Sequence, residues 1–230
     1  MEQKIIFFDI DGTLLDHDKK LPASTKKAVQ LLKEQGHEVA IATGRAPFMF
    51  KDLREELDIQ TYISFNGQYI VLNGEVLYKN PLNKEELQDL TAFAVEHDHP
   101  VVYMDHEDMK SNIEFHDYIE SSISTLKIGF THPHHDPTYF EGHEFSTDVL
   151  PKGGSKARGI ETMIEKLGFD KKDVYAFGDG LNDIEMLEFV GNGVAMGNAE
   201  EVVKEVANLV TKDVGEDGIL HGLELVGLLK

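Results

Sequence analysis

Short apolar runs, each followed by polar residues and glycine, recur along the first third of the chain. They cover Ile5–Phe8, Val39–Ala42 and the region around Tyr62–Ser64. Continuous apolar runs of this length are typical of strands that are buried on both faces. Between them, apolar positions at helical spacing predict helices at about Ser24–Gln35 and Phe48–Leu57. This alternation of strands and helices predicts an α/β fold with a parallel, doubly wound sheet.

The pattern changes after the third strand. The segment "YIVLNGEVLY" has alternating apolar positions on both sides of Asn73-Gly74, a pair of residues typical of hairpin turns. A helix is expected over "NKEELQDLTAFAVEHD" and a short strand at Val101–Met104, but the pattern from there to Leu150 is weak. We therefore predict a smaller α+β domain over residues 83–150, inserted between core segments at residues 1–82 and 151–230.

The alternation of helices and strands returns after "LPKGGS". Helices are expected at about Ser155–Leu167, Ile184–Phe189 and Glu200–Ala207. Strands are expected at Val174–Phe177, which ends in "GDGLND", and near Gly193–Ala195. These elements complete the predicted core.

Composition and charge limit the classes of partner. The chain has 230 residues, of which 41% are hydrophobic and 28% charged, as in an ordinary globular protein. Its formal net charge of −20 argues against a nucleic-acid partner. No apolar stretch approaches the ~20 residues of a membrane span, and the apolar run near the N-terminus is too short for a signal peptide. We therefore expect a cytoplasmic protein that contacts neither membrane nor nucleic acid.

Acidic side chains gather where predicted strands end. Asp9 and Asp11 follow the first strand, where alternation points both carboxylates to one side and Ile10 into the sheet. Ligands of open α/β sheets bind at this edge, and converging carboxylates repel one another unless a cation lies between them. A few carboxylates with open water positions suit Mg²⁺ better than Ca²⁺. The sequence therefore predicts a Mg²⁺ site made by Asp9, Asp11, Asp179 and Asp183.

The same edge offers groups suited to phosphoryl transfer. An aspartate can be the covalent nucleophile, but the attacking carboxylate and the phosphate are both anionic and need positive charge around them. Lys156 can supply part of that charge, and Thr43 can donate a hydroxyl hydrogen bond. Gly44 lets the backbone approach a phosphate closely, and Asp11 is placed to act as acid and base.

Four motifs now stand in order along the chain: "DIDGTLLD", "IATGR", "GGSKARGI" and "GDGLNDIEML". Together they resemble the four motifs of the haloacid dehalogenase-like hydrolases. The insert between the second and third motifs resembles the Cof-type subfamily, whose α/β cap (C2-type) enters there. The resemblance implies a Rossmann-like core in which the strand that carries Asp9 lies beside the strand that carries Asp179.

The resemblance also implies a role for each residue of the site. Asp9 would be the nucleophile and a Mg²⁺ ligand, and Asp11 the acid/base, with its backbone carbonyl on the metal. Thr43 and Lys156 would hold the phosphoryl oxygens. The remaining assignments are a metal ligand for Asp179, orientation of a metal-bound water or of Lys156 for Asp183, phosphate contact for Asn182, and contact with the cap or the leaving group for Arg45.

The expected activity is Mg²⁺-dependent hydrolysis of a small phosphorylated metabolite, such as a sugar phosphate, an FMN-like nucleotide or pyridoxal phosphate, through an aspartyl phosphate. The alternatives are phosphoryl transfer by a mutase of the same fold, a receiver-like signalling module, and a binding protein without turnover. A monomer or a homodimer is expected. The insert is short for the subfamily, and its histidines His132, His134 and His135 stand in a segment of loop composition rather than at metal-ligand spacing.

Overall fold

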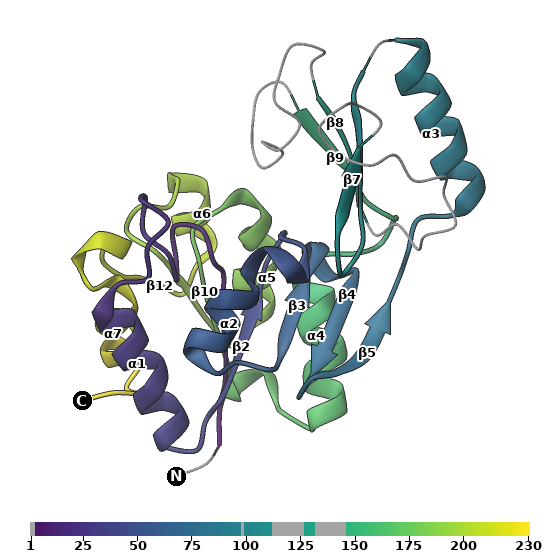
Figure 1. The fold of residues 1–230 in the computed structure, drawn as a ribbon. Helices are drawn as coiled ribbons and strands as arrows, with labels where there is room; N and C mark the ends of the chain where they lie inside the picture. The colour runs from purple at the N-terminus through teal and green to yellow at the C-terminus, as the bar shows by residue number, and fades with distance from the viewer. Residues whose placement is uncertain (1–2, 98, 112–126, 132–145) are drawn as a thin grey trace.

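The protein folds around one large and one small β-sheet, in a computed structural model that describes residues 3–97, 99–111, 127–131 and 146–230 (Figure 1). The strands are β1 (Ile5–Phe8), β2 (Glu38–Ala42), β3 (Tyr62–Ser64), β4 (Tyr69–Leu72), β5 (Glu75–Lys79), β6 (Val101–Met104), β7 (Met109–Ser111), β8 (Lys127–Thr131), β9 (Ser146–Val149), β10 (Val174–Gly178), β11 (Asn192–Ala195) and β12 (Leu209–Val210). The α-helices are α1 (Ala23–Glu34), α2 (Lys51–Leu57), α3 (Lys84–Glu96), α4 (Lys156–Leu167), α5 (Ile184–Phe189), α6 (Glu201–Val206) and α7 (Gly218–Leu225). Short 3₁₀ helices are η1 (Pro47–Phe50), η2 (Phe65–Gly67), η3 (Lys171–Asp173), η4 (Leu181–Asp183) and η5 (Val214–Glu216).

The large sheet has the strand order β12-β11-β10-β1-β2-β3-β4-β5. Its strands pair in parallel from β12 to β3, whereas β4 and β5 form the predicted antiparallel hairpin. In the register of the central strands, Phe8 lies beside Phe177 on one side and Ile41 on the other. The carboxyl ends of β1, β2 and β10 therefore meet at one edge, and the strand that precedes Asp9 lies beside the strand that precedes Asp179, as predicted.

Apolar layers cover both faces of the large sheet. Ile6 and Phe8 face a cluster that includes side chains of α1, α2 and α7. Ile5 and Phe7 face a second cluster that includes side chains of α4, α5 and α6. All of these β1 side chains are fully buried, which explains why the strand is apolar at every position rather than at alternate ones. The predicted α/β class with a mostly parallel sheet is confirmed.

Several element boundaries differ from the predictions. The helix expected at Phe48–Leu57 is divided, because η1 begins at Pro47 and Phe50 has φ −130°, ψ 25° before α2 starts. The strands β7, β8, β9 and β12 and the helix α7 were not predicted. Strands β7 and β12 have only three and two residues, too few for an apolar period to be visible.

The small sheet has the strand order β7-β6-β8-β9, with antiparallel pairing throughout, and lies beyond β4 and β5 together with α3 (Figure 1). Its strand β6 is buried on both faces: Val101 and Tyr103 pack with Leu87 of α3, whereas Met104 belongs to the core cluster that includes Tyr69. The ring of His106, in the turn after β6, stacks on Tyr69 with centroids 5.2 Å apart. The boundaries at residues 83 and 150 stay a prediction.

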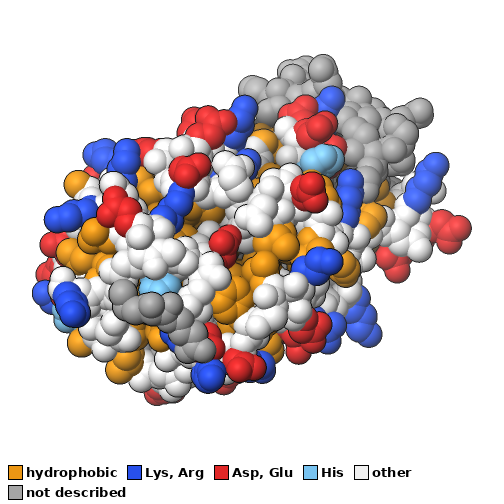
Figure 2. Space-filling view, turned by 90° about the horizontal axis from the view of Figure 1, so that it is seen from below, with side chains coloured by type: hydrophobic (Ala, Val, Ile, Leu, Met, Phe, Trp, Pro, Cys, Tyr) orange, Lys and Arg blue, Asp and Glu red, His pale blue; other side chains and the backbone are white. Residues whose placement is uncertain are grey.

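The surface near the N-terminus carries both signs of charge. Figure 2 shows this face from below, with acidic and basic side chains interspersed around a central hydrophobic area. The excess of acidic residues is therefore not segregated as a single block on this face. Among the described residues, no helix has the length and apolar character needed to cross a lipid bilayer.

Candidate active site

The parallel strands deliver polar side chains to one edge of the large sheet. Asp9 follows β1 directly, and its backbone N–H continues the ladder by donating to the carbonyl of Phe177 at 2.9 Å. Asp179 follows β10, and Thr43 follows β2 with its N–H bonded to the carbonyl of Ile63 at 2.9 Å. Regular pairing thus holds these side chains at the edge where ligands of such sheets bind.

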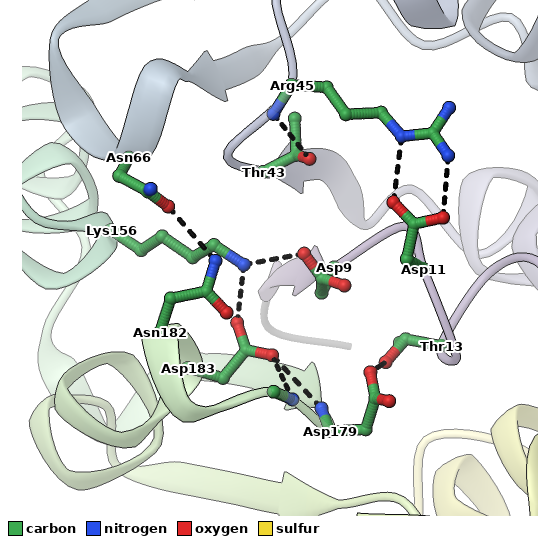
Figure 3. A network of polar contacts seen from close by, with 11 residues as sticks. Asp9, Asp11, Thr13, Thr43, Arg45, Asn66, Lys156, Asp179, Asn182 and Asp183 are labelled. Carbon is green, nitrogen blue, oxygen red and sulfur yellow. Dashed lines mark hydrogen bonds and ion pairs between the residues drawn. The ribbon is translucent and has the colours of Figure 1, made fainter. Parts of the chain in front are cut away.

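Asp9, Asp179 and Asp183 form an acidic cluster in which one carboxylate oxygen of each lies within 4.8 Å of the others. Lys156, the first residue of α4, has a side chain with no exposed surface. Its Nζ donates to Asp9 Oδ1 at 2.5 Å and to Asp183 Oδ1 at 2.6 Å (Figure 3). The predicted lysine and three of the four predicted carboxylates therefore meet at one point.

The cluster holds more negative than positive charge. Burial raises the pKa of Asp9, and the nearby Asp183 and Asp179 add to this rise, which the Lys156 ammonium offsets only in part. Burial, together with Asp183, raises the pKa of Asp179 to about 6. Burial alone would lower the pKa of Lys156, but Asp183 and Asp9 raise it, so the lysine stays charged. Hard divalent cations bind carboxylate oxygens, and such a cation would offset the excess negative charge of the cluster. The carboxylates of Asp9 and Asp179 therefore fit a divalent cation.

Two residues that the sequence analysis did not single out orient Asp179. Thr13 Oγ1 donates to Asp179 Oδ1 at 2.9 Å, and Asn198 Nδ2 donates to Oδ2 at 3.1 Å. Asn198 Nδ2 also lies 2.9 Å from the carbonyl oxygen of Gly12, and its Oδ1 accepts from the N–H of Val214 at 2.9 Å. Thr13 stands inside the first motif, but nothing in the local pattern marks Asn198, which follows a strand far along the chain.

Asp183 is fully buried and uses both carboxylate oxygens within the protein. Oδ1 accepts from Lys156, and Oδ2 accepts from the backbone N–H groups of Asp179 and Gly180, both at 3.0 Å. The sequence predicts Asp183 in the Mg²⁺ site, and the resemblance gives it the orientation of a metal-bound water or of Lys156. These contacts favour the orientation of Lys156 and of the loop after β10 over direct metal ligation.

The carboxylate of Asp11 is not part of the acidic cluster. Arg45 Nε donates to Oδ2 at 2.8 Å and Arg45 Nη2 to Oδ1 at 2.6 Å, and Lys19 Nζ lies 2.5 Å from Oδ1. Burial would raise the pKa of Asp11, but the hydrogen bonds from Arg45 and Lys19 outweigh it and lower the pKa. Three of the four predicted carboxylates therefore converge, and the fourth, that of Asp11, instead pairs with the cations of Arg45 and Lys19. Ile10 is fully buried, as predicted.

The predicted phosphate-binding residues lie on the other side of Asp9. Thr43 is buried, and its Oγ1 accepts from the N–H of Arg45 at 3.1 Å. Asn182 Nδ2 donates to Asn66 Oδ1 at 3.1 Å. A Cβ at Gly44 would lie 3.3 Å from Asn66 Nδ2, so the loop after β2 approaches Asn66 closely. The sequence analysis gave Asn66 no role.

His132, His134 and His135 lie outside the described residues.

Comparison with known proteins gives this geometry a context. The family model described as haloacid dehalogenase-like hydrolase matches residues 6–137 and 117–223. "Putative phosphatase YkrA" of Bacillus subtilis (strain 168) is 47% identical over 259 aligned positions, which cover 100% of both chains. Since this chain has 230 residues, at least 29 of those positions have no counterpart in it. The two pieces of the family match overlap within the predicted insert, which agrees with a departure from the family pattern there.

Two further relatives have names that specify a substrate. "5-amino-6-(5-phospho-D-ribitylamino)uracil phosphatase YcsE" of Bacillus subtilis (strain 168) is 30% identical over 96% of this chain and 94% of its own length. The solved structure of the HAD subclass IIB sugar phosphatase BT4131 is 27% identical, with a TM-score of 0.81, and the match covers 99% of this chain and all of that one.

Proposed function

Because this chain belongs to the haloacid dehalogenase-like hydrolases, of the Cof type, and is a phosphoric monoester hydrolase, we propose that it cleaves a small phosphorylated metabolite in a Mg²⁺-dependent reaction through an aspartyl phosphate. The observation that supports this most directly is the contact between buried Lys156 and Asp9. A carboxylate with a fixed cation beside it can receive an anionic phosphoryl group, which a cluster of acids alone would repel.

In the proposed reaction, an oxygen of Asp9 attacks phosphorus and the bond to the leaving oxygen breaks. Asp11 gives that oxygen a proton, then takes one from the water that attacks the aspartyl phosphate, and inorganic phosphate leaves as the bond to Asp9 breaks. Asp9, Asp179 and the backbone carbonyl of Asp11 would hold Mg²⁺, which supplies further positive charge for the phosphoryl oxygens.

The other polar residues at this edge of the large sheet would bind and position the phosphoryl group. Lys156 and the hydroxyl of Thr43 would hold phosphoryl oxygens, with the backbone of Gly44 and the amide of Asn182 completing the cradle. Asp11 can donate a proton only after it parts from Arg45 and Lys19, since both cations favour its ionised form. An anionic substrate would attract Arg45 and thereby release Asp11, which gives Arg45 a place beside the substrate.

The two relatives with named substrates suggest where to begin the search. Their names give a ribitylamino phosphate and sugar phosphates, both phosphate esters on a polyhydroxylated carbon chain. We propose the same class for this enzyme, with FMN-like nucleotides and pyridoxal phosphate as the next compounds.

Release of inorganic phosphate from a panel of these esters tests the proposal. We expect turnover in the presence of Mg²⁺, loss of turnover with EDTA and recovery when excess Mg²⁺ is added. Transfer of phosphate to a second hydroxyl without free phosphate would identify a mutase instead. A folded, Mg²⁺-bound protein that releases phosphate from none of the panel would contradict hydrolysis of this substrate class.

Mg²⁺ affinity is expected to rise with pH. The metal binds ionised carboxylates, so protons on Asp9 and Asp179, whose pKa values are raised, compete with it. As pH falls below about 8, where Asp9 takes up a proton, affinity should weaken by up to about tenfold per pH unit, and below about 6, where Asp179 takes up another, by up to about a hundredfold per pH unit. Calorimetric titration with Mg²⁺ between pH 5.5 and 7.5, in buffers of different ionisation enthalpy, should show proton release. Asp179→Asn is the control, and an affinity independent of pH would contradict this assignment.

A further inference from the structure

The segment between β3 and β4 has an unusual backbone. Phe65, Asn66 and Gly67 have φ values of 50°, 51° and 94° in succession. Left-handed conformations are common for glycine, tolerated by asparagine and unfavourable for a buried aromatic residue such as Phe65. A backbone of this kind persists only where its surroundings fix it, and it is found often at functional sites.

The surroundings of this segment are the loops of the candidate active site. The N–H of Asn66 donates to the carbonyl of Thr43 at 3.0 Å, and the N–H of Phe65 donates to the carbonyl of Arg45 at 3.3 Å. Both bonds attach the segment to the loop after β2, which carries the proposed phosphate contacts. The backbone of Phe65 and Asn66 is therefore hydrogen-bonded to the loop after β2 at two points.

The side chain of Asn66 faces a different loop. Its Oδ1 accepts from Asn182 Nδ2 at 3.1 Å, across 116 positions of sequence (Figure 3). Its Nδ2 lies 3.3 Å from the position that a Cβ at Gly44 would occupy. Asn182 belongs to η4, in the loop after β10. The amide of Asn66 thus lies between the two loops that present Gly44 and Asn182: it hydrogen-bonds Asn182 and lies close to the position that a side chain at Gly44 would occupy.

The next residues reach the start of α4, which carries Lys156. A Cβ at Gly67 would lie 2.2 Å from the carbonyl oxygen of Ser155, so only glycine allows this approach. Gln68 is fully buried, and its Nε2 donates to the carbonyl of Pro151 at 2.7 Å. Four consecutive residues therefore contact each of the segments that present the proposed phosphate-binding groups.

We propose that Asn66 is a positioning residue of the phosphate site, whose side-chain amide holds Asn182 and the Gly44 loop at the separation that a phosphoryl group requires. This rests on the proposed function, because the phosphate contacts of Asn182 and Gly44 are part of it. Asn66 itself need not touch the substrate. If Asn66 served only to adopt a left-handed backbone, glycine could replace it without loss of phosphate affinity. If its side-chain amide positions the phosphate site, glycine would weaken phosphate binding, and this difference makes the proposal testable.

The test compares Asn66→Gly with Asn73→Gly. Both replace an asparagine that has a φ close to 50°, but Asn73 lies in the β4–β5 turn, away from the candidate site. We expect Asn66→Gly to raise KM for a panel substrate and the inhibition constant for inorganic phosphate by about tenfold, the size of one lost hydrogen bond, with less than about threefold change in kcat. Asn73→Gly should change none of these quantities.

A double-mutant cycle shows whether Asn66 acts through Asn182. Asn182→Ala should raise both constants, and Asn66→Gly added to it should raise them by less than about twofold further, because the contact is already lost. Asn66→Gly that binds phosphate as the wild type does, or effects that multiply in the double variant, would overturn the proposal. The melting temperature of each variant shows whether a change in these constants reflects loss of the contact or unfolding of the protein.

Binding of inorganic phosphate to the Mg²⁺-loaded protein, measured by calorimetry, keeps this test separate from the proposed activity. A wild-type protein that binds phosphate but turns over no panel ester would contradict the proposed hydrolysis, and the comparison of Asn66→Gly with Asn73→Gly would still decide the role of Asn66. A wild-type protein that hydrolyses esters while Asn66→Gly leaves phosphate affinity unchanged would contradict the role of Asn66 alone.

Discussion

The Asp9→Asn variant is expected to lose at least about 10³-fold in kcat while it stays folded. An amide is a far weaker nucleophile than a carboxylate, so the proposed aspartyl phosphate would not form. Asparagine has nearly the same shape as aspartate and can still accept a hydrogen bond from Lys156. Phosphate release at saturating substrate and Mg²⁺ measures the loss.

The stability of Asp9→Asn should reveal the electrostatics of the cluster. Because the pKa of Asp9 is raised on folding, the folded protein binds more protons than the unfolded chain above about pH 4, and stability falls as pH rises through this range. Asparagine does not titrate. Without metal, the variant should therefore be at least as stable as the wild type, with a difference that grows from pH 5 to pH 8, whereas stabilisation by Mg²⁺ should be weaker. A variant that melts well below the wild type at pH 8 would contradict this view of the cluster.

Asp11→Asn is the matched control, since it changes a neighbouring carboxylate with a different proposed role. With p-nitrophenyl phosphate, whose leaving group needs no proton, the first step should still occur in Asp11→Asn and the hydrolysis of the aspartyl phosphate should stall. Rapid mixing should then show a burst of nitrophenol equal to the enzyme concentration. Asp9→Asn should show no burst. A burst from Asp9→Asn would remove Asp9 from the nucleophile role, and the absence of a burst from Asp11→Asn would contradict the role of Asp11 in the second step.

The parts of the site that the sequence could predict are those governed by local pattern. A strand apolar at every position, followed at once by Asp9, indicates both a buried strand and a polar edge. The α/β alternation predicts parallel strands, whereas the place of β1 beside β10 is what the family resemblance implies. Lys156 was identified because it stands in a motif at the start of a helix. Its complete burial between two carboxylates was not visible, because the contact with Asp9 spans 147 positions of sequence.

What the sequence could not predict depends on pairing between distant loops. The clamp of Arg45 and Lys19 on Asp11 requires the loops after β1 and β2 to meet, and nothing in the spacing sets side-chain direction beyond the end of a strand. The side-chain amide of Asn66 contacts Asn182, 116 positions away, and that of Asn198 contacts the carbonyl of Gly12, 186 positions away, as well as Asp179, 19 positions away. Single asparagines occur in many turns, so their local pattern favours a turn rather than a site.

Removal of the buried cation is expected to have the largest effect on stability. Lys156→Met keeps the length of the side chain and its apolar stem but leaves Asp9 and Asp183 without the ammonium that both contact. Breaking a buried ion pair by deleting one partner costs about 3–5 kcal/mol, because an uncompensated charge stays buried. We expect a loss of this size in the free energy of unfolding at pH 8, measured by urea denaturation without metal, and no detectable turnover. Lys166→Met, an exposed lysine of the same helix, should change little.

The loss in Lys156→Met should depend on pH with a definite sign. In the wild type the pKa of Lys156 is raised on folding, so its stabilising contribution is fully present below the ordinary lysine pKa and constant between pH 5 and pH 9. In the variant, the carboxylates that face each other should take up a proton as pH falls, which removes the repulsion. The difference between wild type and variant should therefore shrink from pH 8 to pH 5.

Asp183→Asn added to Lys156→Met should recover part of the loss at pH 8, because it removes one of the two unpaired charges. A loss independent of pH, with no recovery in the double variant, would mean that Lys156 stabilises the fold by packing rather than by charge.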